Sequence, residues 1–174
     1  MSKGYVHVYT GSGKGKTTAA LGLAMRAAGA GLRVYIAQFI KEMEYSEIQV
    51  IRERFPEITV ELFGTPEWCI NGRAANDRDR KAAAEGLAKA RREIMSGRYD
   101  LVILDELTLI VYFDLVPEDD VLALIRERPD DVELVITGRE ATDRLIEAAD
   151  VVTEMKKVKH YYDRGVTSRK GIEC

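Results

Sequence analysis

The sequence predicts an α/β fold built on a parallel, mostly six-stranded sheet with helices on both faces. The main observation is that short, β-branched apolar runs alternate with helical stretches along the chain. One of these runs, LVIL at residues 101–104, is so uniformly apolar that both of its faces must be covered. The length of 174 residues fits one domain, and we expect residues 1–174 to form it.

The predicted strands are short apolar segments bounded by glycine, proline or polar residues. They are expected at residues 5–9, 33–39, 59–63, 100–107, 132–137 and 151–155. Segments such as RVYIAQF and VELVIT are rich in β-branched and aromatic side chains, which favour strands. Because helical stretches separate the strands, parallel pairing is favoured.

The predicted helices fill the intervals between the strands. They are expected at residues 17–30, 46–55, 77–96, 117–128 and 141–149. Ser46 can cap the second helix, which Pro56 ends, and Pro117 can start the fourth. Residues 41–46 and 64–76 fit neither pattern, and long loops of this kind in a compact domain are often functional.

Charge and composition exclude several classes of protein. The net charge is −3, with the basic residues spread along the chain, so we expect no nucleic-acid partner. No run of 18 apolar residues occurs and the start leads directly into a strand, so we expect neither a membrane span nor a signal segment. Cys69 and Cys174 form no C-x-x-C motif and are expected to be reduced thiols, which predicts a cytoplasmic location.

Residues 11–18, GSGKGKTT, have the features of a phosphate-binding loop with a shortened spacing. The usual pattern is G-x-x-x-x-G-K-[ST], whereas this chain has G-x-x-x-G-K-T. Between a strand and a helix, glycine N–H groups can turn towards phosphate, and the helix N-terminus adds a partial positive charge. We expect Lys16 to contact the phosphates and the Thr17 hydroxyl to bind Mg²⁺. The predicted nucleotide-binding residues of the loop are Gly11, Ser12, Gly13, Lys14, Gly15, Lys16, Thr17 and Thr18.

A second motif, LVILDE, supports a nucleotide site. Its strand ends at Asp105 and Glu106, which places two carboxylates at the edge of the sheet where the loop lies. Either carboxylate can hold Mg²⁺ directly or through water. No N/T-K-x-D guanine motif occurs, so ATP is favoured over GTP. Arg139 ends the segment ITGR on the same edge, where it can reach phosphates or form a surface salt bridge.

Several segments, in this order, resemble the P-loop ATP:corrinoid adenosyltransferases. They are GSGKGKTTAALGLAMRAAG, VYIAQFIK, YDLVILDEL, VITGR and the spaced VKH, GV and GIE, which together extend from residue 6 to residue 173. The shortened loop is the form found in that family. The resemblance implies a recombinase-like P-loop NTPase fold, a homodimer, and a nucleotide site that includes Arg26.

The resemblance also implies a reaction on carbon instead of phosphorus. In this family ATP is bound with reversed polarity, so that the ribose C5′ faces the corrinoid. Reduced cobalt, Co(I), attacks C5′ and triphosphate leaves, with Lys16, Thr17 and Glu106 as the catalytic residues. The implied metal ligands are Thr17, Asp105 and Glu106. No general base is needed, and an external electron donor must supply the Co(I) state.

Two further residues are assigned to the corrinoid by the resemblance. Trp68 matches the tryptophan of the family segment G-x-G-F-T-W, and it either covers the corrinoid face or anchors the core. The phenylalanine of that segment is missing here, so Phe39 or Phe63 is left to take its place. His160 lies in the VKH segment, where it either meets the corrinoid edge or packs within the protein. Complete cobalamin and an early a,c-diamide corrinoid both remain open as the substrate.

Two other functions compete with this one. A small P-loop nucleotide kinase would need an acceptor site and usually an arginine-rich lid, and the sequence has no such segment. An ATP-dependent switch protein would need an arginine finger and a γ-phosphate sensor, for which Arg139 is the candidate. Adenosyl transfer to a corrinoid is therefore the favoured function.

Overall fold

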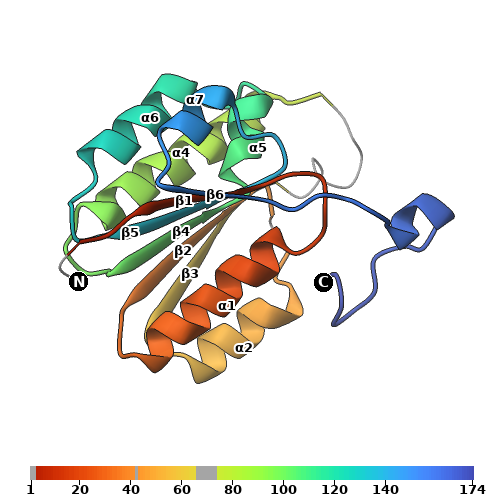
Figure 1. Ribbon diagram of the computed structural model, residues 1–174, viewed down its shortest axis with the longest axis horizontal. Coiled ribbons are helices and arrows are strands. Elements are labelled where there is room, and N and C mark those ends of the chain that lie inside the picture. The colour runs from red at the N-terminus through yellow and green to blue at the C-terminus, as the bar shows by residue number, and fades with distance from the viewer. Residues whose placement is uncertain (1–2, 42, 66–73) are drawn as a thin grey trace.

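The computed structural model describes residues 3–41, 43–65 and 74–174, in which strands and helices alternate (Figure 1). The strands are β1 (Val6–Thr10), β2 (Val34–Phe39), β3 (Ile58–Phe63), β4 (Leu101–Asp105), β5 (Glu133–Thr137) and β6 (Val151–Glu154). The helices are α1 (Lys16–Gly29), α2 (Ser46–Arg54), α4 (Asp77–Ile94), α5 (Leu107–Tyr112), α6 (Glu118–Glu127), α7 (Asp143–Glu147) and the 3₁₀ helix η1 (Tyr161–Arg164).

The strands form one parallel sheet of six, in the order β3-β2-β4-β5-β1-β6. Helices α1 and α2 cover one face, and α4, α5, α6 and α7 cover the other (Figure 1). Every residue of β2 and β4 is buried, as expected for strands that are covered on both faces. The predicted α/β fold is confirmed, and the architecture is that of a P-loop NTPase-like domain.

Local sequence explains how the helices are set against the sheet. The buried side of α1 consists mainly of alanines, which let the helix lie close to the strands. Helix α4 begins with a capping box in which the Asn76 side chain accepts from the backbone N–H of Asp79 and the Asp79 carboxylate accepts from that of Asn76. No helix in the described ranges is long and apolar enough to cross a membrane.

The prediction of a strand over residues 100–107 was wrong at its end. Strand β4 stops at Asp105, Glu106 adopts the left-handed conformation with φ 61°, and α5 starts at Leu107. The backbone N–H of Glu106 donates to the Thr137 hydroxyl, which helps to fix this turn. A continuous apolar run has the same pattern in a buried strand and in a buried helix, so the sequence did not separate the two.

Candidate active site

The phosphate-binding loop between β1 and α1 closes around the side chain of Lys16. The Lys16 ammonium donates to the carbonyl oxygens of Gly11 and Gly13, at 2.7 and 2.8 Å. Gly11 and Gly15 have φ values of 95° and 116°, which residues with a side chain rarely adopt. Burial lowers the pKa of Lys16 by more than the nearby carboxylates raise it. The loop thus holds a cation in a tight turn at the N-terminus of a helix, where anions bind readily.

Neighbouring strands fix the loop from outside. The backbone N–H of Gly11 donates to the carbonyl of Arg139, after β5, and that of Gly13 donates to the carbonyl of Met155, after β6, at 3.2 and 2.6 Å. A Cβ atom on Gly13 would lie 2.5 Å from the Met155 oxygen. Glycine is therefore required at position 13 by close backbone contact, as well as by any phosphate that binds there.

Asp105, at the end of β4, is a buried carboxylate that four side chains meet. The hydroxyls of Thr17 and Thr137 donate to its Oδ1 at 2.9 and 2.6 Å. The Gln38 amide and the Lys41 ammonium donate to its Oδ2 at 3.1 and 2.9 Å. Asp105 thereby links the first turn of α1 to the ends of β2, β4 and β5, since parallel strands end at one edge of the sheet.

Glu106 is held in an environment that is unfavourable to its charge. Its Oε2 atom is buried without a hydrogen-bond partner. Burial raises the pKa of the Glu106 carboxyl, and the neighbouring Asp105 raises it further, against the opposing effect of Lys41, Lys16 and Arg139. Left-handed backbone and an unpaired buried oxygen are both costly, and such costs gather at functional sites.

Lys41 is a charged residue of this site that the sequence analysis did not assign. Its ammonium bonds Asp105 and lies 3.5 Å from the Thr17 hydroxyl. Burial alone would lower the pKa of Lys41, but the Asp105 and Glu106 carboxylates outweigh burial and raise it. Ile40, with φ 70°, turns the chain so that Lys41 reaches back over the sheet edge. The predicted functional loop at residues 41–46 was the signal that pointed here.

The oxygen atoms at this edge suit Mg²⁺. The Thr17 hydroxyl and the Glu106 carboxylate are hard oxygen donors, and the unpaired Oε2 of Glu106 is available to a cation. In the described part of the chain no group of three or more His, Cys, Asp or Glu side chains gathers. The donor set fits an ion that takes its remaining ligands from nucleotide phosphates and water, as Mg²⁺ does.

The other predicted nucleotide-binding residues are placed in different ways. Arg139 is near enough to Lys16 and Glu106 to affect the pKa of both. Ser12 and Thr18 are exposed on the loop and at the start of α1. Arg26 lies in the last turn of α1, about 15 Å along the helix from Lys16, so the structure does not bring it to the loop.

The residues assigned to the corrinoid are less completely placed. Trp68 lies outside the described residues. His160 precedes η1, where its Nδ1 accepts from the backbone N–H of Tyr162 at 3.1 Å. Phe39 is fully buried and contacts Phe63, whose ring is only partly buried. Of these two rings, Phe63 is the one with a surface left to offer a ligand.

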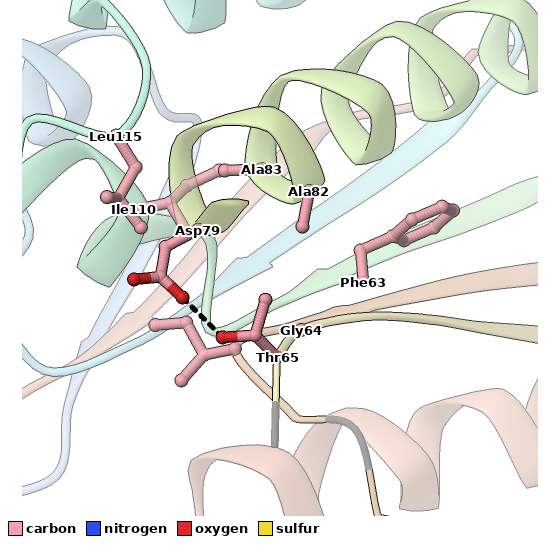
Figure 2. A pocket seen from close by; sticks show the side chains of 9 residues that line it. Phe63, Gly64, Thr65, Asp79, Ala82, Ala83, Ile110 and Leu115 are labelled. Carbon is pink, nitrogen blue, oxygen red and sulfur yellow. Dashed lines mark hydrogen bonds between the residues drawn. The ribbon is translucent and has the colours of Figure 1, made fainter. Parts of the chain in front are cut away.

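A small pocket lies between the end of β3 and helices α4 and α5 (Figure 2). Figure 2 shows Phe63, Ile110 and Leu115 around it, with the Thr65 hydroxyl donating to the buried Asp79 carboxylate. The pocket therefore has an apolar wall and one buried acid, and its rim at Thr65 is where the described chain breaks before residue 74.

The parallel sheet, the glycine loop around Lys16 and the Thr17–Asp105 contact define a P-loop nucleotide-binding protein. The model of the family described as ATP:corrinoid adenosyltransferase BtuR/CobO/CobP matches residues 2–174, and the chain belongs to that family. It is 38% identical over 172 residues to the corrinoid adenosyltransferase of Escherichia coli (strain K12), covering 98% of this chain and 86% of that protein.

Two further relatives agree. The chain is 36% identical over 172 residues to the corrinoid adenosyltransferase CobA of Salmonella typhimurium, covering 98% of this chain and 86% of that protein. It is 37% identical over 175 residues to the corrinoid adenosyltransferase of Pseudomonas aeruginosa, covering 98% of this chain and 84% of that protein.

Proposed function

We propose that this protein transfers the 5′-deoxyadenosyl group of ATP to the cobalt of a reduced corrinoid and releases triphosphate. The family match over residues 2–174 carries the proposal. The shortened loop closed around Lys16 supports it, because it offers a cationic cradle for the triphosphate. ATP and a corrinoid are therefore the substrates.

The reaction is a displacement at the ribose C5′ carbon. The electron pair of Co(I) forms the cobalt–carbon bond, and the carbon–oxygen bond breaks with its pair on the α-phosphate of the leaving triphosphate. Lys16 and the N–H groups of the loop stabilise this developing charge, and Lys41 and Arg139 add further positive charge nearby. No proton is transferred in the attack, so no general base is required.

Mg²⁺, if bound, would be held by Thr17 and Glu106, with Asp105 orienting the Thr17 hydroxyl. It would neutralise charge on the triphosphate as a Lewis acid. Lys41 supplies a permanent positive charge beside the same Asp105 carboxylate. Since Asp105 already accepts four hydrogen bonds, we assign it the positioning role and Glu106 the role of metal ligand.

The corrinoid is proposed to bind beside the end of β3, at Phe63. The partly exposed ring of Phe63 supports this placement, because a corrinoid face is largely apolar. Trp68 as the residue facing the corrinoid, and His160 at its edge, stay predictions. We further propose one catalytic domain over residues 1–174, a homodimer, a cytoplasmic location and an external electron donor.

The direct test is optical. A chemically reduced corrinoid, incubated anaerobically with ATP, Mg²⁺ and the protein, is expected to change its absorbance spectrum to that of a light-sensitive adenosylcorrinoid. The same incubation with Lys16→Ala serves as the control. A spectrum that stays that of the reduced corrinoid, with the wild-type protein folded and ATP bound, would exclude adenosyl transfer.

A further inference from the structure

The chain after β6 returns to the phosphate-binding loop and touches it at two points. At its start, the carbonyl of Met155 accepts from the backbone N–H of Gly13 at 2.6 Å. At its end, Glu173 meets the side chain of Lys14 at 2.8 Å. Figure 1 shows this segment, in blue, running from β6 through η1 to a C-terminus beside α1. We call residues 155–174 the C-terminal tail.

Lys14 is directed entirely to this tail. Its ammonium donates to the Tyr161 hydroxyl at 3.0 Å, to the Ile172 carbonyl at 3.0 Å and to Glu173 Oε1 at 2.8 Å. Three partners are as many as an ammonium has protons to donate. Lys16, by contrast, donates to the carbonyls of its own loop. The two lysines of the loop therefore face different parts of the protein.

Glu173 is the centre of the contact. Besides Lys14, its carboxylate accepts from the Tyr161 hydroxyl, from the backbone N–H of Arg169 at 2.9 Å and from the Arg169 guanidinium. Hydrogen bonds from Arg169, Lys14 and Tyr161, in that order of effect, hold the pKa of Glu173 well below its usual range. The carboxylate is thus ionised whenever the tail is in this position.

Hydrophobic burial does not explain why the tail lies here. Strand β6 is exposed along its whole length, and η1 buries none of its side chains. The tail is instead held by the polar contacts at Lys14 and by a further hydrogen bond at the start of α2. There the Ser46 hydroxyl donates to the Cys174 carbonyl at 3.3 Å. Polar contacts thus hold an exposed segment against the phosphate-binding loop, and surface segments of this kind often carry binding residues.

The charges of the cluster favour an anion. Lys14 and Arg169 carry two positive charges against the single negative charge of Glu173, so the cluster has a net charge of +1. Both cations also lie over the Tyr161 ring, at 5.8 and 4.9 Å from its centroid. The Arg169 side chain is 50% exposed, so it is accessible to a bound ligand.

We propose that Glu173 is a positioning residue for the nucleotide. It holds Lys14 and Arg169 together at the rim of the phosphate-binding loop, so that the C-terminal tail forms a wall of the ATP site and adds a cation to it. The proposal rests on the proposed nucleotide site at Lys16. Loss of Glu173 should weaken ATP binding, because Lys14 and Arg169 would no longer be held at the rim of the loop, from which their positive charge acts on the phosphates.

The test is a double-mutant cycle on ATP affinity, measured by calorimetry on the full chain with Lys14→Met, Glu173→Gln and the double variant. We expect each single variant to raise the Kd for ATP about three- to tenfold, as is usual for charge-assisted contacts at a partly exposed site. The double variant should be no weaker than Lys14→Met alone. In steady-state kinetics Glu173→Gln should raise the KM for ATP and leave the KM for the corrinoid unchanged.

Asp163→Asn is the matched control. Asp163 lies in the same tail and pairs with Lys157 at 3.0 Å, away from the phosphate-binding loop. Like Glu173→Gln, the substitution Asp163→Asn removes one negative charge from the tail, but it should leave the affinity for ATP at the wild-type value. Unchanged or tighter ATP binding by Glu173→Gln, or additive effects of the two substitutions, would overturn the proposal.

Lys16→Ala distinguishes a failure of this proposal from a failure of the proposed nucleotide site at Lys16. If Lys16→Ala weakens ATP binding and Glu173→Gln does not, the nucleotide site is right and the role of the tail is wrong. If Lys16→Ala leaves ATP affinity unchanged, the nucleotide site itself is misplaced and both proposals fail. Melting temperatures of all variants, measured without nucleotide, show that each compared protein is folded.

Discussion

The phosphate-binding loop and the C-terminal tail meet at one site but are held in place by different interactions. The loop joins a buried strand to a helix, and its lysine at position 16 is itself buried. The tail has almost no buried side chain and is held by hydrogen bonds and ion pairs to Lys14 and Ser46. The loop is therefore part of the folded core, whereas the tail is held against it mainly by polar contacts.

This difference has consequences for stability and for ligand binding. Removing a buried polar group leaves its hydrogen-bond partners unpaired in a place that water does not reach. Changes at the loop should therefore affect both the stability of the fold and the affinity for ATP. Exposed ion pairs contribute little to stability, so changes in the tail should affect ATP affinity with little effect on melting. Glu173→Gln, described above, tests the tail, and the following substitutions test the loop and its surroundings, from the largest expected effect to the smallest.

Lys16→Ala is expected to have the largest effect on ATP binding. The substitution removes the cation that the loop carbonyls hold at the helix N-terminus. Charge-assisted hydrogen bonds are worth about 1.5–3 kcal/mol, which corresponds to a loss of affinity of about ten- to a hundredfold. Calorimetric titration with ATP measures it, and an unchanged Kd would show that the loop is not the site.

Gly13→Ala should disturb the junction between the loop and the tail. The added Cβ would lie 2.5 Å from the Met155 oxygen, so one of the two backbones must shift. Forced overlap of this kind costs about 1–3 kcal/mol, and ATP affinity should fall as well. Gly22→Ala is the matched control, because in the middle of α1 the added Cβ would meet no atom within 4 Å apart from the nearby backbone of the helix itself.

The control should behave in the opposite way. Alanine is favoured over glycine inside a helix by about 0.5–1 kcal/mol, so Gly22→Ala should raise the melting temperature and leave ATP binding unchanged. Equal melting temperatures for the two variants would mean that the loop is not constrained by the chain after β6.

Glu106→Gln should change the free energy of unfolding less than Gly13→Ala does, and it should stabilise the protein at neutral pH. Burial raises the pKa of Glu106 in the folded protein, so the folded form binds its proton more tightly than the unfolded form does. Wild-type stability should therefore fall as pH rises through the window from the ordinary pKa of about 4.3 to the raised one.

The advantage of the variant should be full above the raised pKa and absent below the ordinary one. Calorimetric melting of both proteins between pH 4 and pH 7 measures this difference. Adenosyl transfer by Glu106→Gln should fall at the same time, since the carboxylate is the proposed metal ligand. A variant that is less stable at pH 7 and fully active would contradict the assignment of Glu106.

The sheet and the contact between Thr17 and Asp105 were open to prediction because they follow from local patterns. Apolar runs predict the strands. Because all the strands are parallel, they end at one edge of the sheet, where the phosphate-binding loop and the carboxylates of Asp105 and Glu106 must meet. Helix α5 was missed because its residues, Leu107–Tyr112, continue the apolar run of β4. Only the left-handed conformation of Glu106 separates the two elements.

Contacts between distant residues carried no such local signal. Lys41 reaches Asp105 across 64 positions of sequence, and does so because Ile40 adopts an unusual backbone conformation. Lys14 and Glu173 are 159 positions apart, and neither residue shows a period or a cap that would pair them. Polar pairs of this kind depend on the complete fold, so they become visible only in three dimensions.

The most direct test of the central claim is the identity of the products. Attack at C5′ should convert ATP and a chemically reduced corrinoid into intact triphosphate and an adenosylcorrinoid in equal amounts, measured together by anion-exchange chromatography and absorbance. A kinase or an ATPase would instead break the bond between the β- and γ-phosphates. Triphosphate equal to the adenosylcorrinoid is the result we expect, whereas ADP or phosphate as the stoichiometric product, with no cobalt–carbon bond formed, would contradict the proposed function.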